Sequence, residues 1–125
     1  MNNIIIDAAA NKIFFKIIVD DASYTSDYPN SRENFDKFAI LLFNFLKENR
    51  IDIKEINNIF INQGPGKFSG IRTSIAVAKA LCITNKLSLY GFNSNDLKDM
   101  KYENVINLYE KGVLIKNLIN PVYSS

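Results

Sequence analysis

The 125-residue sequence contains no histidine and a single cysteine, Cys82. A catalytic triad with a histidine base is therefore impossible, and general acid–base chemistry would depend on carboxylates, lysine or tyrosine. A zinc site built from Cys and His ligands is excluded for the same reason. We expect neither a metal site nor histidine-dependent catalysis.

The lone Cys82 also excludes an internal disulfide and fits a reducing compartment, where we interpret it as a small buried apolar residue. No apolar stretch approaches the roughly 18 residues that a membrane helix needs. The first residues carry no basic segment of the kind that opens a signal peptide. These absences predict a cytoplasmic protein that does not contact a membrane.

The chain also has no large excess of positive or negative charge, because the formal net charge is only +2. A nucleic-acid surface usually needs a strongly basic face, so we expect no tight contact with nucleic acid by this chain alone. Apolar residues make up 47% of the chain, which is ordinary for a globular protein of one domain.

Apolar runs and turn signals divide the chain into elements in the order βββαβαβαα. The predicted strands cover residues 3–7, 12–19, 23–28, 56–61 and 87–92. The predicted helices cover residues 31–49 (N-cap Ser31), 69–84 (N-cap Ser69), 93–101 and 103–110. Short gaps between the first three strands indicate an antiparallel meander, and the later alternation predicts parallel strands joined by crossover helices.

Two of these helices have more apolar surface than one core requires. At 100° per residue, the apolar side chains of the helix over 31–49 cover roughly 200°, whereas packing on a sheet needs about 100°. The helix over 69–84 is apolar nearly all round, and its alanines allow close approach of another helix. Each helix is either enclosed within its own domain or binds a partner. The candidate interface residues are Phe35, Phe38, Leu42, Phe45, Ile75, Ala76, Lys79, Ala80 and Ile83.

A glycine-rich loop over residues 63–70 follows a buried strand and opens a helix, a position that favours an anion. It is not a Walker A loop, because Phe68 stands where Ser or Thr is required, and it misses a dinucleotide fingerprint at Ser69. Arg72 is a cation in the first helical turn, so we expect it to contact an internal carboxylate, a phosphate or a neighbouring loop. The residues expected to shape this loop or bind an anion are Gly64, Pro65, Gly66, Phe68, Ser69, Gly70 and Arg72.

This loop carries a family resemblance. The run Gly-Pro-Gly-Lys-Phe-Ser-Gly-Ile-Arg over 64–72, followed by Ala76, Ala78, Lys79 and Leu81, resembles the Gly-Pro-Gly-Ser-Phe-Thr-Gly-Leu-Arg signature of the TsaB (YeaZ) family. Residues 4–7, 89–94 and 120–123 resemble the family's first strand, a later strand that enters a helix, and its terminal Pro-Val-Tyr.

The departures from the family pattern lie beside the first strand and in the length, because members of the family are usually much longer and have two lobes, so we expect a minimal form that lacks most of the second lobe. Three alanines follow Asp7 where the family has Thr-Ser after its Asp, so hydroxyls that could assist phosphate or metal binding are absent. The resemblance implies an α/β fold of the actin/Hsp70/sugar-kinase (ASKHA, RNase H-like) type: an N-terminal lobe, βββαβαβ, with a short helical C-terminal tail. The expected division is a lobe over 1–100 and a remnant of the second lobe over 101–125.

The resemblance also implies a function. The chain would be a non-catalytic scaffold subunit that binds TsaD, with TsaE in the assembly, and supports formation of N6-threonylcarbamoyladenosine (t6A) at position 37 of tRNAs that read codons beginning with A. It would need no cofactor, would meet tRNA only through the complex, and could form a homodimer without TsaD. Two alternatives remain open: a small acyl- or phosphotransferase that uses the 63–70 loop, or a self-associating interaction module.

Overall fold

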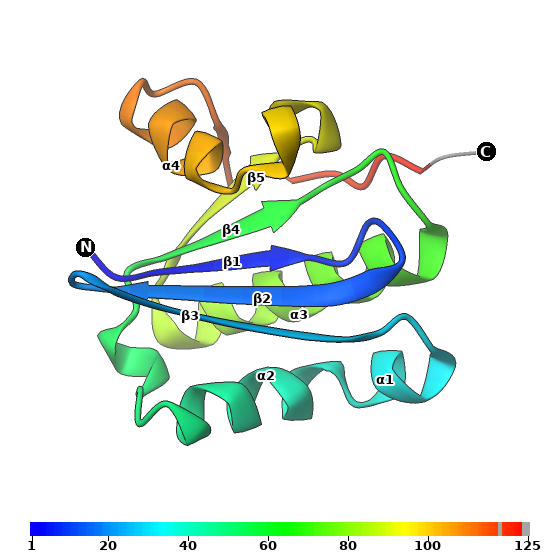
Figure 1. Ribbon diagram of the computed structural model, residues 1–125, viewed down its shortest axis with the longest axis horizontal. Helices are drawn as coiled ribbons and strands as arrows, with labels where there is room; N and C mark the ends of the chain where they lie inside the picture. The colour runs from blue at the N-terminus through cyan, green and yellow to red at the C-terminus, as the bar shows by residue number, and fades with distance from the viewer. Residues whose placement is uncertain (118, 124–125) are drawn as a thin grey trace.

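The computed structural model describes residues 1–117 and 119–123, which form one mixed sheet with helices on both faces (Figure 1). The strand order is β3-β2-β1-β4-β5-β6. The strands are β1 (Asn3–Asp7), β2 (Lys12–Val19), β3 (Ala22–Pro29), β4 (Asn58–Asn62), β5 (Ser88–Phe92) and β6 (Ile115–Lys116). The α-helices are α1 (Arg32–Asp36), α2 (Phe38–Glu48), α3 (Phe68–Asn85) and α4 (Glu103–Glu110).

The strand directions confirm the predicted topology. Strands β1, β2 and β3 form an antiparallel meander, whereas β1, β4 and β5 run parallel. Every residue of β1 and β4 is buried, as expected of central strands covered on both faces. The short strand β6 pairs antiparallel with β5 and was not predicted, because two residues give no periodic signal.

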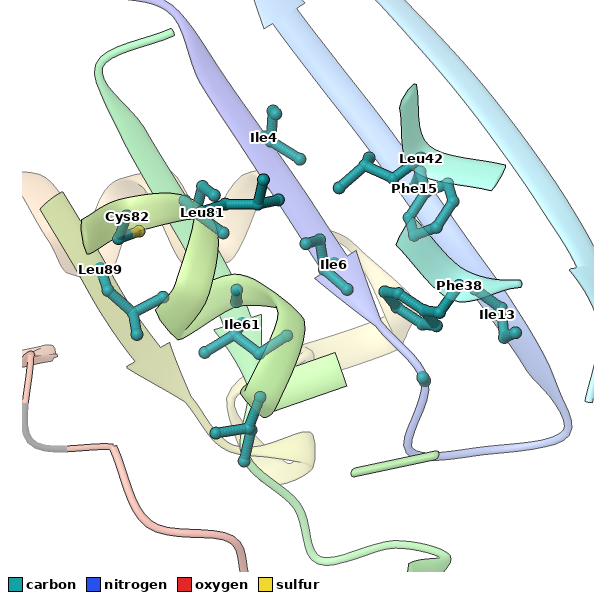
Figure 2. Close-up of a cluster of buried hydrophobic side chains, with 14 of the residues drawn as sticks. Ile4, Ile6, Ile13, Phe15, Phe38, Leu42, Ile61, Leu81, Cys82 and Leu89 are labelled. Atoms are coloured by element: carbon teal, nitrogen blue, oxygen red, sulfur yellow. The ribbon is translucent and has the colours of Figure 1, made fainter. Parts of the chain in front are cut away.

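The larger core lies between the sheet and helices α1, α2 and α3. Alternation along β1 places Ile4 and Ile6 in this core and Ile5 on the opposite face. Phe15 of β2 meets the ring of Phe38 of α2 edge-on, with the ring centroids 5.4 Å apart. Figure 2 shows Ile6, Phe15 and Phe38 among the side chains gathered between the sheet and the helices.

The second face of the sheet carries a smaller core. Ile5, Phe60 and Phe92 from the strands pack with Leu97 and with Val105 of α4. Helix α4 is amphipathic, and its N-terminal end is also near β2, where Lys16 Nζ lies 3.8 Å from Glu103 Oε1. The C-terminal part of the chain therefore belongs to the same folded unit as the first strands.

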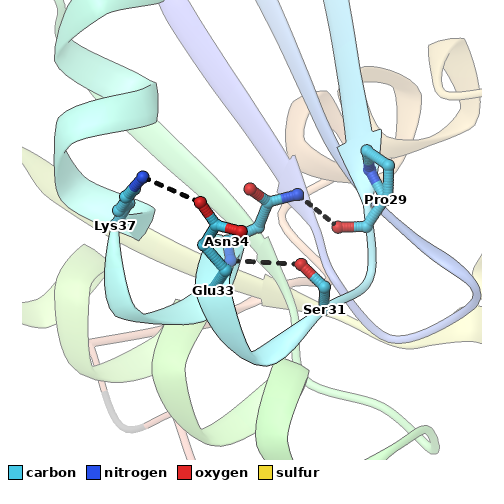
Figure 3. A network of polar contacts seen from close by, with 5 residues as sticks. All are labelled: Pro29, Ser31, Glu33, Asn34 and Lys37. Carbon is cyan, nitrogen blue, oxygen red and sulfur yellow. Dashed lines mark hydrogen bonds and ion pairs between the residues drawn. The ribbon is translucent and has the colours of Figure 1, made fainter.

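Two predicted helices differ from those observed. The helix over 31–49 is divided at Lys37 into α1 and α2, although Ser31 is the predicted N-cap and accepts a hydrogen bond from the Asn34 amide (Figure 3). The predicted helix over 93–101 is wrong. The observed segment instead contains two 3-10 turns, Ser94–Asp96 and Lys98–Met100.

Helix α3 begins two residues earlier than predicted. Its N-cap is Lys67, which makes no side-chain capping bond, and Ser69 is the second residue of the helix. The helix ends at Asn85, where Lys86 takes a left-handed conformation. Among the described residues, no helix has the length and apolar character needed to span a membrane.

Candidate functional site

A buried polar cluster lies where the parallel strands end. Asp7, at the end of β1, is 7% exposed, and its Oδ1 accepts hydrogen bonds from the Ala9 amide (3.1 Å) and from Asn62 Nδ2 (3.0 Å). Its Oδ2 accepts a hydrogen bond of 2.8 Å from the hydroxyl of Tyr102. The carboxylate is thus stabilised by three donors from three segments, which is the usual requirement for a buried charge.

Tyr102 closes this cluster from the side of α4. Its ring is stacked on Phe14 of β2, with centroids 4.4 Å apart and planes 10° apart. Burial raises the pKa of Tyr102 far above its usual range, and the negative charge and hydrogen bond of Asp7 raise it further. Tyr102 therefore stays protonated and acts as a hydrogen-bond donor to Asp7, not as a general base.

Asn62 connects the cluster to the glycine-rich loop. Its Oδ1 accepts a hydrogen bond of 2.9 Å from the Gly64 amide, and its Nδ2 also donates to Ser94 Oγ at 3.1 Å. The Ser94 hydroxyl donates in turn to the Pro65 carbonyl at 3.1 Å. This network joins the ends of β1 and β4 to the segment after β5.

The loop glycines are required for close backbone packing. A Cβ atom on Gly66 or Gly70 would overlap the main chain of Ala9 or Ala8, and one on Gly64 would overlap the carbonyl of Val122. The spaces beside these glycines are therefore filled by the protein's own backbone. The expected shaping role of the loop has a structural cause: the loop is wedged between the β1–β2 turn and the C-terminal segment.

The N-terminal part of α3, which follows the loop, exposes an aromatic ring and a cation. Phe68 is 52% exposed, and its ring lies 4.7 Å from that of Tyr123 and 5.6 Å from the Arg72 guanidinium. The expected contact of Arg72 with an internal carboxylate is wrong, because within the described part of the chain this cation lies over an aromatic ring and joins no ion pair. Pro65 and Ser69 are also exposed.

The candidate interface residues separate into two groups. Four of them are core residues, which corrects their expected position on a partner surface: Phe38, Leu42, Phe45 and Ile75, none more than 4% exposed. They face the sheet, and the three in α2, Phe38, Leu42 and Phe45, explain the wide apolar arc of the first predicted helix. The others are exposed or half-buried on the surface: Phe35, Ala76, Lys79, Ala80 and Ile83.

The sequence reasoning missed Asn62, Ser94 and Tyr102. Asn62 could have been found, because it ends a strand parallel to the one that ends at Asp7, and the ends of adjacent parallel strands are neighbours. Tyr102 gave no such signal, because its contact with Asp7 joins residues 95 positions apart.

Comparison with known proteins gives the family. The model of the tRNA N6-adenosine threonylcarbamoyltransferase family, TsaD, matches residues 30–98, which is more than half of the chain. The chain belongs to the TsaD family.

Two curated relatives are TsaB proteins, in agreement with the predicted resemblance. The tRNA threonylcarbamoyladenosine biosynthesis protein TsaB of Buchnera aphidicola subsp. Schizaphis graminum is 32% identical over 63 residues, covering 50% of this chain and 30% of the relative. The TsaB protein of Buchnera aphidicola subsp. Baizongia pistaciae is 40% identical over 43 residues, covering 34% and 20%.

Solved structures confirm the predicted fold class. YeaZ from Pseudomonas aeruginosa superposes with a TM-score of 0.72 at 14% identity, covering 89% of this chain and 50% of that one. The RuvC structure from Thermus thermophilus gives a TM-score of 0.55 at 8% identity, covering 90% and 80%. The fold is therefore ASKHA and RNase H-like, and the chain is about half as long as the YeaZ structure it matches.

Proposed function

We propose that this chain is a non-catalytic scaffold subunit that binds TsaD and supports t6A formation at position 37 of tRNAs that read codons beginning with A. Residues 1–100 would correspond to the N-terminal lobe of the family and residues 101–125 to a remnant of the second lobe, which in this chain packs on the sheet of the first. TsaE would join the assembly, tRNA would be met only through the complex, and the site of action would be the cytoplasm.

One observation carries this proposal: an apolar stripe on the outer face of α3. Ala76, Ala80 and Ile83 follow helical spacing, all three are exposed, and Ile83 is 82% exposed. The family match over 30–98 includes this helix and α2, whose Ile40 and Phe43 are also exposed. Exposed apolar patches of this kind mark interaction surfaces, and the alanines let a partner helix approach closely.

The polar cluster supports a non-catalytic role. Asp7 is the carboxylate that this fold would offer at the end of its first strand, and its two oxygens accept three hydrogen bonds from the chain itself. A carboxylate held in this way is a structural acceptor. The glycine loop likewise packs on Ala8 and Ala9, so its backbone is already in contact with protein.

Binding to TsaD from the same source tests the proposal by size-exclusion chromatography with light scattering. We expect a one-to-one complex, and we expect Ala76→Glu and Ala80→Glu to abolish it, because a buried unpaired charge at a helix seam is strongly unfavourable. Val113→Glu is the matched control, since Val113 is 62% exposed and lies beyond α4. Failure of the folded chain to bind at tens of micromolar would overturn the proposal.

The acyl- or phosphotransferase alternative makes a different prediction. Such an enzyme would bind acetyl-CoA or ATP as an isolated chain, through residues 63–70. Calorimetric titration distinguishes the two functions, because micromolar binding of either ligand without TsaD would favour the enzyme.

A further inference from the structure

A groove separates α1 from the N-terminal half of α3 on the surface of the helical layer. It has a volume of about 600 Å³, and its lining includes Arg32, Phe35 and Asp36 of α1 with Phe68, Arg72 and Ala76 of α3. Helix α1 is fixed at its start by the Ser31 cap and by a hydrogen bond of 2.8 Å from Asn34 Nδ2 to the Pro29 carbonyl (Figure 3). The groove therefore has two defined walls.

The groove presents two guanidinium groups with little opposing charge. Arg32 and Arg72 are exposed, and neither takes part in an ion pair within residues 1–117 and 119–123. Asp36 is the one carboxylate among the lining residues. The ring of Phe68 lies 5.6 Å from the Arg72 guanidinium, which holds that cation near the wall by a cation–π contact.

The remaining surface of the groove is apolar. Phe35 is half-buried against the main core, and Phe68 is 52% exposed. Ala76 belongs both to the groove and to the exposed stripe on α3, so the groove is continuous with the surface proposed above for TsaD. Arginine and aromatic residues around a pocket are the composition of an interaction hot spot.

This composition fits a carboxylate better than a phosphate. A guanidinium binds a carboxylate through two parallel hydrogen bonds, and the singly charged group can be tolerated beside Asp36. Arg32, Arg72 and Asp36 together give the lining a net charge of +1, which a single carboxylate neutralises and the larger charge of a nucleotide phosphate exceeds. The aromatic and methyl-bearing wall fits an apolar side chain next to that carboxylate.

We propose that this groove binds a segment of the partner subunit that places an Asp or Glu carboxylate between Arg32 and Arg72 and an adjacent large apolar side chain against Phe35 and Phe68. The inference rests on the proposed function and specifies the chemistry of the partner at one part of that interface.

Charge reversal tests the assignment by calorimetric titration of TsaD with Arg32→Glu, Arg72→Glu and the double variant. We expect each reversal to weaken binding at least about 10-fold, because it sets two carboxylates against each other. Arg72→Glu should not disturb the fold, since Arg72 is exposed and joins no ion pair within the described residues, and such surface substitutions change stability little. Lys111→Glu, an equal charge reversal at the C-cap of α4 on the opposite face, should bind like the wild type. Circular dichroism melting of each variant verifies folding.

The outcomes separate the two proposals. If the wild-type chain binds TsaD and the folded reversals bind equally well, the groove assignment is wrong and the scaffold function stands. If the wild-type chain does not bind, both are wrong. If the isolated chain binds ATP and Arg72→Glu removes that binding, the groove is a nucleotide site and the carboxylate assignment is overturned. A partner variant with Arg in place of its groove carboxylate should restore affinity only to the reversed chain.

Discussion

At the scale of single residues, Asp7 connects the start of α4 to the ends of the central strands. Its carboxylate accepts hydrogen bonds from the Ala9 amide in the turn after β1, from β4 and from the start of α4. The Tyr102 hydroxyl is the donor that connects α4 to the strand ends, and its ring is held by Phe14. A carboxylate at a strand end can therefore be structural even in a fold where that position suggests chemistry.

Replacing Tyr102 with Phe removes only the hydroxyl and retains the stack on Phe14. We expect the free energy of unfolding to fall by about 1.5–3 kcal/mol, because a hydrogen bond to a charged and buried acceptor is lost. Urea denaturation measures the change. The exposed Tyr24→Phe variant is the control and should stay within about 0.5 kcal/mol of the wild type. Equal effects of the two substitutions would show that the bond to Asp7 contributes nothing.

Cys82 gives a pH-dependent prediction. Burial raises the pKa of its thiol to about 11 from an ordinary value of 9.0. Because the folded-state pKa is the higher one, the stabilisation from the neutral thiol is complete below about pH 9 and is lost as the pH rises toward about 11. Urea titrations at about pH 8 and about pH 10.5 should therefore show a larger loss of stability for the wild type than for Cys82→Ala. Equal losses of stability in the two proteins would contradict a raised pKa for the Cys82 thiol.

At the scale of elements, the glycine loop and α3 form one unit with the turn after β1. The resemblance in sequence falls on the residues whose backbones meet: Gly66 against Ala9 and Gly70 against Ala8. The alanines that replace the family's hydroxyl residues lie on the other side of the same contact. The glycines of the loop therefore allow close backbone packing, whereas the spacing of these glycines in the sequence also suggested an anion-binding site.

The contact of Gly70 with Ala8 can be tested by Gly70→Ala. A methyl group there would overlap the Ala8 carbonyl, so we expect a loss of about 1–3 kcal/mol even though alanine is the better helix former. Ser69→Ala, at the exposed neighbouring position of the same helical turn, is the control and should be near neutral. Urea unfolding of both variants gives the comparison. A Gly70→Ala chain as stable as the control would mean that the β1 turn can move away.

The elements predicted well were those with a strong local signal. Strands β1 and β2 and helix α4 have the predicted bounds, because apolar runs and capping or glycine signals delimit them. The helix over 31–49 was divided at Lys37, and the segment over 93–101 formed 3-10 turns, because tertiary contacts there outweigh helix propensity. The wide apolar arc of α2 was a signal of burial, and periodicity alone could not distinguish burial by the sheet from burial by a partner.

At the scale of the whole molecule, the two faces of the sheet have different outer surfaces. One face carries α1, α2 and α3, whose exposed side includes Ile40, Phe43, Ala80 and Ile83. The other face carries α4, whose contacts with the sheet seal the smaller core. Because the exposed apolar residues of α2 and α3 lie on one layer, a partner that covers this layer would bury residues from both helices (Figure 1).

The same layer gives a prediction for the isolated chain. Apolar area on the outer face of α3 would pair with a second copy of itself, so we expect a concentration-dependent homodimer by light scattering. Ala80→Glu should keep the chain monomeric, and Val113→Glu should leave the dimer intact, because Val113 lies beyond α4. Since one surface cannot hold two partners, added TsaD should convert the homodimer into a heterodimer. A homodimer that persists in excess TsaD would instead identify the chain as a self-associating module.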